Sequence, residues 1–592
     1  MPLPIWVDAL CINQADDAEK SWQVQMMDQI YLGATKTFVY LGPSTRESYE
    51  AIRSFSFYGR KALQYGILNL TSGPNPNEPF EFGYERWTLG PSDVHGKKII
   101  DKIIRNMQDP NKISPLKMLQ SIMHRPWWSR IWVLQELLLS PNPIFVCGYQ
   151  TISAREFVAS VRLYEATLTV YYENLLSMPT DSSAYDLNLP LIRKIGHETR
   201  SLHNMADVPA LVLYTTQLRQ RERSRCHGIE EPYFGLGNLW DLVQDITLSS
   251  RRLDASDPRD RIYALIGIAR LSRVDTVTLQ PEYALTCAYV YAQATYLFMQ
   301  YTGPRMLMLA IHSHKRTSFL NLSSWIVDWS LTDLMTAPFP IVDSRRQDTF
   351  QFTRSACDKS ILTSSVTVYG KIEVLKVKVS TPGSNEHQPD IIRRLLRYLS
   401  DLEIDSCATL EDLNHPYEQL ISAMALNSHP DNFGSETSEI APMKLHAMTI
   451  LIREELFKTH SLEVQASQDT ECATSTKTID SWLRSCPTIN PEPCSVEPSQ
   501  QVGTLSLVLD RIRDTIEQDA KVFVVDGDLI GIGSSLIRDG DLLIEYEKDA
   551  LRFVIRAVEG GFYKLIDKAC VPRLDSERTT TSNCQASTIS LC

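Results

Sequence analysis

Four polar side chains stand where ligands bind in parallel β-sheets, namely at or just beyond the carboxyl ends of predicted strands. They are Asp8, Asn13, Gln14 and Ser44. The first three lie in or after the apolar run 5–12, and the fourth follows the run 36–42. Because parallel strands end at one edge of a sheet, we expect these side chains at a common ligand-binding edge. The alternative is that Asn13 and Gln14 only form a turn and cap the next helix.

Two residues of the first run raise separate questions. Asp8 lies between apolar neighbours, so a buried Asp8 would need a partner, and Arg125 or Arg130 is a natural candidate. Cys11 is a candidate nucleophile by position, but no histidine is near it in the sequence. We therefore interpret Cys11 as a small buried thiol.

A third group of charged residues occurs at 257–261, with the sequence Asp-Pro-Arg-Asp-Arg. Aspartate before a proline is typical of a helix start, with Asp257 as the cap and Pro258 in the first turn. Asp257, Arg259, Asp260 and Arg261 could form a ligand site, but capping and ion pairing explain their charges without a ligand.

The elements that must position these residues are readable near the start of the chain. The run 5–12 predicts a strand, Asp16 and Glu19 form a capping-box pattern, and a helix is expected up to about residue 33. The run 36–42 predicts a second strand. A strand, a helix and a strand in this order predict a parallel βαβ unit. Residues 144–147 predict a further strand.

The remaining chain divides by composition into several predicted regions. We expect an α/β domain over 1–150 with an insertion loop at about 72–92, and a mainly helical region over 151–335. Beyond it we expect a mixed region over 336–460 with a β-hairpin at 361–379 that turns at Tyr369–Lys371. The rest is a flexible linker at 461–502, a small antiparallel β module at 503–572, and a disordered tail at 573–592.

Composition excludes several classes of protein. The 59 basic and 71 acidic residues leave a net charge of −12, which disfavours binding to nucleic acid and anionic membranes. No run of apolar residues is long enough to span a bilayer. The 12 cysteines are scattered without a Cys-x-x-Cys pair, which predicts reduced thiols, no metal site and an intracellular, cytoplasmic location.

Three segments together resemble the fungal heterokaryon-incompatibility (HET) domain family in order, spacing and residue identity. They are Trp6–Gln14, Val39–Gly42 and Arg125–Glu136. Weaker resemblance continues at Asp257–Leu265 and Ser324–Ser330. The resemblance implies a protein of fungal non-self recognition and programmed cell death that acts through association with other proteins, including self-association.

The HET domain is also distantly similar to Toll/interleukin-receptor (TIR) domains, some of which cleave NAD. In those enzymes a helix that opens with a serine and a tryptophan carries the catalytic glutamate. Ser129, Trp132 and Glu136 match that arrangement here. The resemblance therefore implies Glu136 as a catalytic carboxylate, Trp132 as a ligand-binding residue and NAD as a substrate. The alternative is that Glu136 is a polar residue at the domain surface and that the tryptophans belong to the hydrophobic core.

One departure from the family pattern concerns the sheet. The pattern begins with an earlier strand of the Leu-Ser-Tyr-x-Trp-Gly kind, which has no counterpart in this sequence. In a flavodoxin-like or TIR-like order that strand is central, so the parallel sheet is predicted to be incomplete. A misplaced start codon, direct pairing of the two flanking strands and a remnant domain remain open.

These observations lead to a ranked set of functions. We favour an incompatibility protein that works by protein association and has no cofactor. The alternatives are a TIR-like NAD glycohydrolase that uses Glu136, and an inactive truncated paralogue. The expected fold is an α/β N-terminal domain, a mainly helical region and a small C-terminal antiparallel β module.

Overall fold

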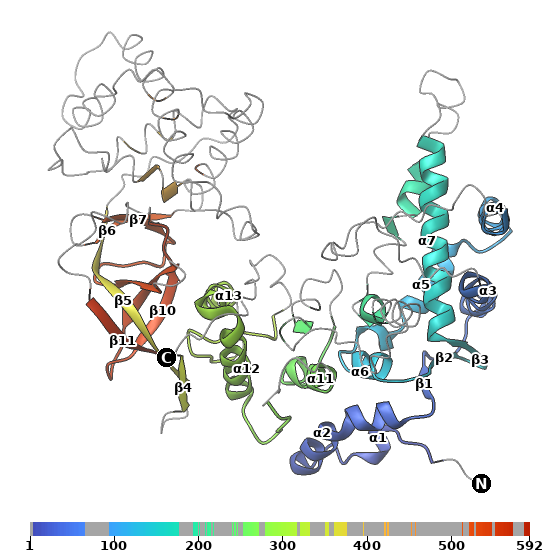
Figure 1. Cartoon of the computed structure of the whole chain (residues 1–592), viewed down its shortest axis with the longest axis horizontal. Helices are drawn as coiled ribbons and strands as arrows, with labels where there is room; N and C mark the ends of the chain where they lie inside the picture. Colours follow the sequence, from blue (N-terminus) through green and yellow to red (C-terminus); the bar gives the residue numbers. More distant parts are fainter. Residues whose placement is uncertain are drawn as a thin grey trace, which may run out of the picture. The chain divides into compact units, whose positions relative to one another are not determined.

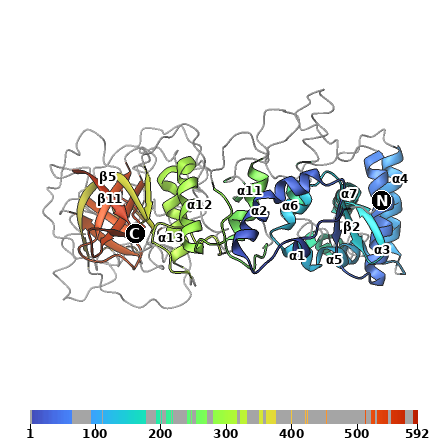
Figure 2. The same ribbon diagram turned by 90° about the horizontal axis from the view of Figure 1, so that it is seen from below.

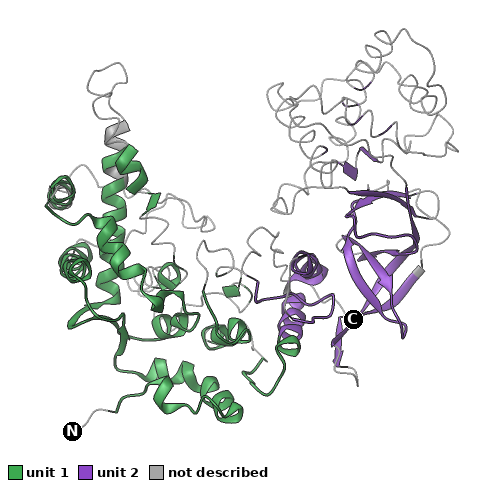
Figure 3. Cartoon of the chain, turned by 180° about the vertical axis from the view of Figure 1, so that it is seen from behind, with its two compact units in different colours: residues 1–290 green, residues 291–592 purple. Residues whose placement is uncertain are grey.

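A computed structural model describes most of the N-terminal half of the chain and the strands near its C-terminus. The described residues are 4–64, 94–109, 111–176, 253–270, 279–315, 320–331, 350–354, 360–375, 520–525, 529–546, 551–571 and 585–592, with short stretches or single positions between 193 and 246 and between 395 and 512. The chain divides into two compact units, residues 1–290 and 291–592 (Figure 3).

The first unit contains a three-stranded sheet in the order β1-β2-β3 (Figure 1). Strand β1 (Thr37–Tyr40) runs parallel to β2 (Pro143–Cys147), with Val39 opposite Phe145. Strand β3 (Gln150–Ser153) pairs antiparallel with β2. The sheet is therefore mixed, and its parallel pair joins segments about a hundred residues apart.

Three helices pack on this sheet or on one another beside it. They are α3 (Arg46–Gln64), α5 (Pro115–Met123) and α7 (Ala154–Leu176). Aromatic rings fill the space between α3, α7, β2 and the short 3₁₀ helix η2 (Pro126–Ser129). The ring contacts include Phe55 with Phe157 and Trp128 with Phe145. Trp127 and Trp128 are buried, so this part of the tryptophan motif is core.

The expected strand at 5–12 is wrong, because residues Asp8–Cys11 form the short helix α1. Its backbone groups bond within the segment, from Cys11 N–H to Val7 O and from Ile12 N–H to Asp8 O, so the segment needs no strand partner. Every side chain of α1 lies at or near the surface. Cys11 is accordingly exposed, which corrects its interpretation as a buried thiol.

The predicted helix start after this segment is confirmed. Helix α2 spans Asp17–Gly33, and the Asp16 carboxylate accepts from the N–H groups of Ala18 and Glu19. The Glu19 carboxylate accepts in turn from the Asn13 N–H at 3.1 Å. Because 5–12 is not a strand, α2 does not complete a βαβ unit. The parallel crossover runs instead from β1 through α3, α4 (Val94–Gln108), α5 and α6 (Val133–Leu138) to β2.

Helices α2, α6 and α11 (Asp260–Ala269) contact one another in the first unit. Gly267 of α11 permits the close approach. A Cβ atom at this position would lie 3.0 Å from both the Asp28 Cβ of α2 and the Gln135 Nε2 of α6. Gln135 is buried and donates to the Ala264 carbonyl at 2.9 Å, which fixes α6 against α11.

The second unit begins within helix α12 (Cys287–Thr302), which is followed by the 3₁₀ helix η3 (Gly303–Arg305) and α13 (Met306–His314). Its strands are β4 (Gln351–Arg354), β5 (Ser360–Val374), β6 (Lys521–Val525), β7 (Leu529–Gly533), β8 (Leu542–Tyr546), β9 (Leu551–Ala557), β10 (Tyr563–Lys568) and β11 (Gln585–Leu591). Among these strands, β5 pairs with β4, β6, β8 and β11.

Strands β5, β8, β9, β10 and β11 close into a ring, since β11 pairs with both β10 and β5 (Figure 2). The predicted hairpin at 361–379 is wrong because β5 is one continuous strand, and Gly370 is a bulge rather than a turn. The predicted disorder of the whole tail is also wrong for 585–592. Strand β11 supplies backbone partners that β5 and β10 would otherwise lack.

Several other expectations fall outside the described residues. These are the insertion loop at 72–92 and the linker at 461–502.

The approach of α11 to α2 and α6 predicts that Gly267→Ala destabilises the chain. The added methyl group must displace Asp28 or Gln135, at a cost of about 1–3 kcal/mol for an overpacked core. Thermal unfolding followed by calorimetry measures the loss. Gly33→Ala is the matched control, because a Cβ atom there meets nothing within 4 Å. Equal melting temperatures for Gly267→Ala and the wild type would refute the close packing.

Candidate functional site

Arg130 lies between two carboxylates that come from separate elements. Its guanidinium is 3.7 Å from the Asp8 Oδ2 of α1 and 3.6 Å from the Glu136 Oε1 of α6. Of the two predicted partners of Asp8, the structure therefore selects Arg130. The Asp8 side chain is 43% exposed and Glu136 only 14%, so the buried end of this group is Glu136.

The Glu136 carboxylate is held by two donors. Its Oε2 accepts from the Trp127 indole N–H at 2.6 Å, and its Oε1 faces Arg130. Burial raises the pKa of Glu136, although the positive charge of Arg130 and the Trp127 hydrogen bond act in the opposite direction. A carboxylic acid with a raised pKa is a candidate proton donor, and it is also what burial alone produces.

A buried tyrosine adjoins this group. Tyr31 of α2 is buried, and desolvation together with the charges of Glu136 and Asp8 raises its pKa strongly. The Trp6 ring packs edge-on against Tyr31 at 5.9 Å. Asp8, Tyr31, Arg130 and Glu136 thus form one cluster, which we call the Arg130 cluster.

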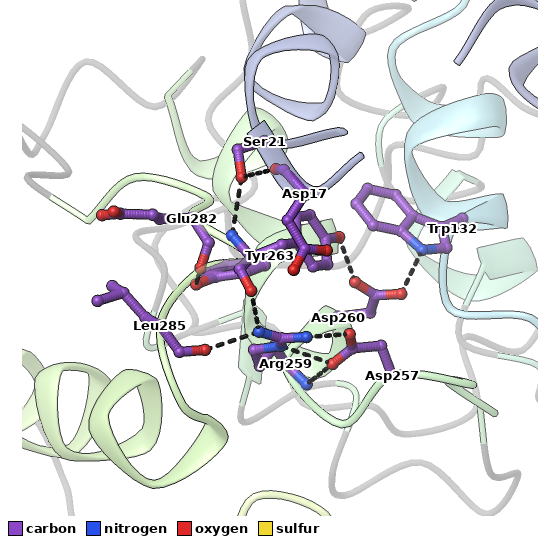
Figure 4. A network of polar contacts seen from close by, with 10 residues as sticks. Asp17, Ser21, Trp132, Asp257, Arg259, Asp260, Tyr263, Glu282 and Leu285 are labelled. Carbon is purple, nitrogen blue, oxygen red and sulfur yellow. Dashed lines mark hydrogen bonds and ion pairs between the residues drawn. The ribbon is translucent and has the colours of Figure 1, made fainter. Parts of the chain in front are cut away.

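Trp132 belongs to a second network. Its indole N–H donates to the Asp260 Oδ2 at 3.0 Å (Figure 4). The Tyr283 hydroxyl donates to the other oxygen at 2.5 Å. Asp260 is 6% exposed, and burial raises its pKa. Burial and the adjacent Asp260 raise the pKa of Tyr283 as well, so the phenol remains a proton donor. We call Trp132, Asp260 and Tyr283 the Asp260 network.

Arg259 fixes the loop that carries Tyr283. Its guanidinium binds both oxygens of Asp257, at 2.9 and 2.7 Å, and donates to the carbonyls of Tyr283 and Leu285 (Figure 4). Although burial opposes it, the Arg259 contact holds the pKa of Asp257 below its usual range. The predicted ion-pair role is confirmed for Asp257 and Arg259, whereas Asp260 has a different role as a buried acceptor.

The N-terminal helix α2 joins the same loop. The Ser21 hydroxyl accepts from the Tyr283 N–H at 2.8 Å and donates to the Asp17 carbonyl. The Lys20 ammonium lies 3.8 Å from the centre of the Tyr283 ring. Both residues are ordinary helix-surface residues in sequence, so no local signal identifies their partner 262 residues away.

The structure does not gather the predicted ligand-binding residues at one sheet edge. Asp8 lies in the Arg130 cluster and Trp132 in the Asp260 network. Asn13 and Gln14 are exposed in the turn before α2, where the Asn13 side chain accepts from the Ala15 N–H. Ser44 lies in the loop between β1 and α3. The predicted common edge depended on a strand at 5–12, which is a helix.

Two further properties bear on the chemistry of the described part of the chain. Its residues contain no group of three or more His, Cys, Asp or Glu side chains placed to hold a metal ion. No described helix combines the length and apolar character that crossing a membrane requires.

Comparison with known proteins shows a similarity over the N-terminal part of the chain. Residues 2–136 match the family model described as heterokaryon incompatibility protein (HET). This segment is therefore similar to a HET domain. Heterokaryon incompatibility protein 6, OR allele, of Neurospora crassa is 23% identical to the chain over 356 residues. This match covers 56% of the chain and 45% of the relative, so the chain spans less than half of the relative's length. No solved structure matches significantly.

The HET match ends at Glu136, inside helix α6 and in the Arg130 cluster. Trp132 is therefore within the HET domain, while its acceptor Asp260 and the second donor Tyr283 lie outside the matched residues. The Asp260 network thus connects the HET domain to the helices that follow it in the chain.

Loss of the Asp260 carboxylate is expected to destabilise the chain. In Asp260→Asn the amide NH₂ must face either Trp132 N–H or Tyr283 O–H, which leaves a buried donor unpaired at a cost of about 1–3 kcal/mol. Tyr283→Phe removes one donor only and should cost less. The exposed Asp101→Asn is the control, with an effect within about 0.5 kcal/mol. Calorimetry of the full chain measures these shifts, and an unchanged Asp260→Asn melting temperature would refute the network.

The raised pKa of Glu136 predicts a pH-dependent stability difference between the wild type and Glu136→Gln. The folded state holds this proton more tightly than the unfolded chain, whose pKa is about 4.3. The stability of the wild type relative to the variant is therefore greatest below that pH and falls as the pH rises through the folded pKa. Chemical denaturation of both proteins between pH 4 and pH 8 tests this.

Glu47→Gln is the matched control for this pH series. The pKa of Glu47 is lowered, first by its own backbone N–H and then by Thr45, so its contribution is complete above the unfolded pKa. The difference in stability between the wild type and Glu47→Gln should therefore not change with pH above about pH 5. Parallel curves for both variants would contradict a raised pKa of Glu136.

Proposed function

We propose that the chain acts in fungal heterokaryon incompatibility and that its HET domain works by binding other proteins. The family match over residues 2–136 and the Neurospora relative support this function. In members of the resembled family the outcome is growth arrest and cell death, which we extend to this chain as part of the proposal.

The observation that carries protein association is an excess of exposed apolar side chains in the first forty residues. Of the eleven large hydrophobic residues exposed in the described part of the chain, six lie between 5 and 40: Ile5, Val7, Leu10, Trp22, Phe38 and Tyr40. Phe38 and Tyr40 are 65% and 62% exposed on β1. These two residues alternate with the buried Val39, so they lie on the same face of β1, and neighbouring exposed aromatic residues are typical of protein-binding surfaces.

The geometry of Glu136 supports association over catalysis. Both carboxylate oxygens already have protein partners, Trp127 and Arg130, and these contacts join η2 to α6. A catalytic carboxylate must instead reach a substrate atom. Among the described residues, no contact joins the ligand candidates Asn13, Gln14 or Ser44 to the Glu136 carboxylate.

A second candidate is a TIR-like NAD glycohydrolase with Glu136 as its essential carboxylate. One observation favours it, namely the raised pKa of a partly buried glutamate beside Asp8. In this mechanism the carboxylate would stabilise the positive charge that develops on the ribose as the N-glycosidic bond breaks.

Inducible expression in a filamentous fungus separates the two proposals. We expect the wild type and Glu136→Gln to arrest growth alike, with nicotinamide release at the background level. The double variant Phe38→Ser/Tyr40→Ser should relieve the arrest, because it removes two exposed aromatic contacts without opening the core. Leu536→Ser, at a half-exposed apolar position in the second unit, is the control and should still arrest growth.

Two outcomes would contradict these expectations. Normal growth on wild-type expression would refute the incompatibility function. Loss of both growth arrest and nicotinamide release in Glu136→Gln, with an unchanged melting temperature, would establish the glycohydrolase in place of the association mechanism.

A further inference from the structure

A separate polar cluster lies where β1 and β2 end. The two parallel strands are followed by the loops at 41–45 and 148–149, and the Gly148 N–H donates to the Gly42 carbonyl at 2.9 Å. Around this link lie Ser44, Ser48, Arg125 and Cys147. We call these four side chains and the two glycines the Arg125 cluster. It shares no residue with the Arg130 cluster or the Asp260 network.

The Arg125 guanidinium has only uncharged partners in the described part of the chain. Its Nε donates to the Ser121 carbonyl at 3.0 Å, and its Nη2 lies 3.4 Å from the Ser48 hydroxyl and 3.9 Å from the Cys147 sulfur. Its Nη1 makes no hydrogen bond to the described residues, and no described carboxylate pairs with the group. A half-buried arginine without an acidic partner retains an unused donor and an uncompensated positive charge.

Two glycines leave the unused groups uncovered. Gly42 and Gly148 have φ values of 98° and 59°, a conformation that favours glycine. A Cβ atom on Gly42 would lie 3.3 Å from Arg125 Nη1, and one on Gly148 would lie 2.6 Å from Ser44 Oγ. The Ser44 hydroxyl has no hydrogen-bond partner among the described residues. The linked glycines therefore leave room beside two donors, the Nη1 of Arg125 next to Gly42 and the Ser44 hydroxyl next to Gly148.

The cluster does not depend on the N-terminus of α3, because the groups there are already in use. The Thr45 N–H donates to Ser48, and the Ser48 N–H donates to the Thr45 hydroxyl. The Glu47 carboxylate accepts from its own N–H and from Thr45, with Arg46 and Lys117 adding positive charge. An incoming ligand would be bound by Arg125 and Ser44 themselves.

We propose that the Arg125 cluster binds an oxyanion, a phosphate or carboxylate group of a small molecule. The unused Nη1 of Arg125 can donate charge-assisted hydrogen bonds to an oxygen of such a group, and the Ser44 hydroxyl can donate to another. The position agrees with the general rule that ligands of α/β sheets bind at the carboxyl ends of parallel strands. In a chain with a net charge of −12, an unpaired arginine at this edge marks a local site for an anion.

Isothermal titration calorimetry of the full chain tests the proposal with inorganic phosphate and, separately, acetate as probes at constant ionic strength. We expect saturable binding of at least one probe, and the stronger probe identifies the ligand group as phosphate or carboxylate. Arg125→Gln should weaken this binding by about tenfold or more, since charge-assisted hydrogen bonds are lost. Arg53→Gln, on the exposed face of α3, is the matched control and should leave the affinity unchanged.

Ser44→Leu supplies an independent variant, because Arg125 also holds structural contacts and its removal can unfold the loops. Ser44 is exposed, so leucine there leaves the core intact and covers the donors. We expect weakened anion binding with an unchanged melting temperature. No saturable binding of either probe to the wild type would overturn the proposal. Unchanged affinity in a folded Arg125→Gln or Ser44→Leu protein would also overturn it.

Discussion

The Asp260 carboxylate is the contact on which the architecture of the first unit depends. A buried carboxylate is costly unless each oxygen has a donor, and here Trp132 and Tyr283 supply one donor each. The two donors come from segments about 150 residues apart, and Arg259 and Ser21 hold the Tyr283 loop in place from two further elements. Because all of these partners must be present at once, the network requires α2, α6 and α11 to pack together, and Gly267 makes that packing possible.

The HET domain is for this reason not a self-contained part of the fold. Its strand β1 pairs with β2, which begins seven residues beyond the matched segment, and its Trp128 packs against Phe145 and Phe157. The Ile131 N–H, within the match, donates to the Asp254 carbonyl outside it. Residues 2–136 therefore supply one side of a core whose other side comes from residues 143–168, 254–270 and 279–285. The Arg130 cluster lies at the end of the matched segment. The family motif that contains Arg130 and Glu136 therefore has a structural role in this chain, because its side chains bind one another.

Much of this arrangement could be predicted from sequence where the signal is local. The capping aspartate Asp16, the strands at 37–40 and 143–147 and the buried tryptophans follow from residue type and spacing. The prediction of a strand at 5–12 was wrong because a mostly apolar run of eight residues is compatible with both a strand and a short helix. Only the lack of a strand partner decides between the two. The Asp260 network was missed because its donors are far apart in sequence. Gly370 was misread as a turn since a bulge and a hairpin both favour glycine.

Hydrogen–deuterium exchange tests most directly the claim that the HET domain and α11 open as one unit. The measurement compares amide protection in α2 and α11 between the wild type and Trp132→Phe, which removes one donor to Asp260 and keeps most of the ring volume. The account predicts that protection falls in both helices by the same factor, because one network joins them. Loss of protection in α11 alone, with α2 unchanged, would contradict it.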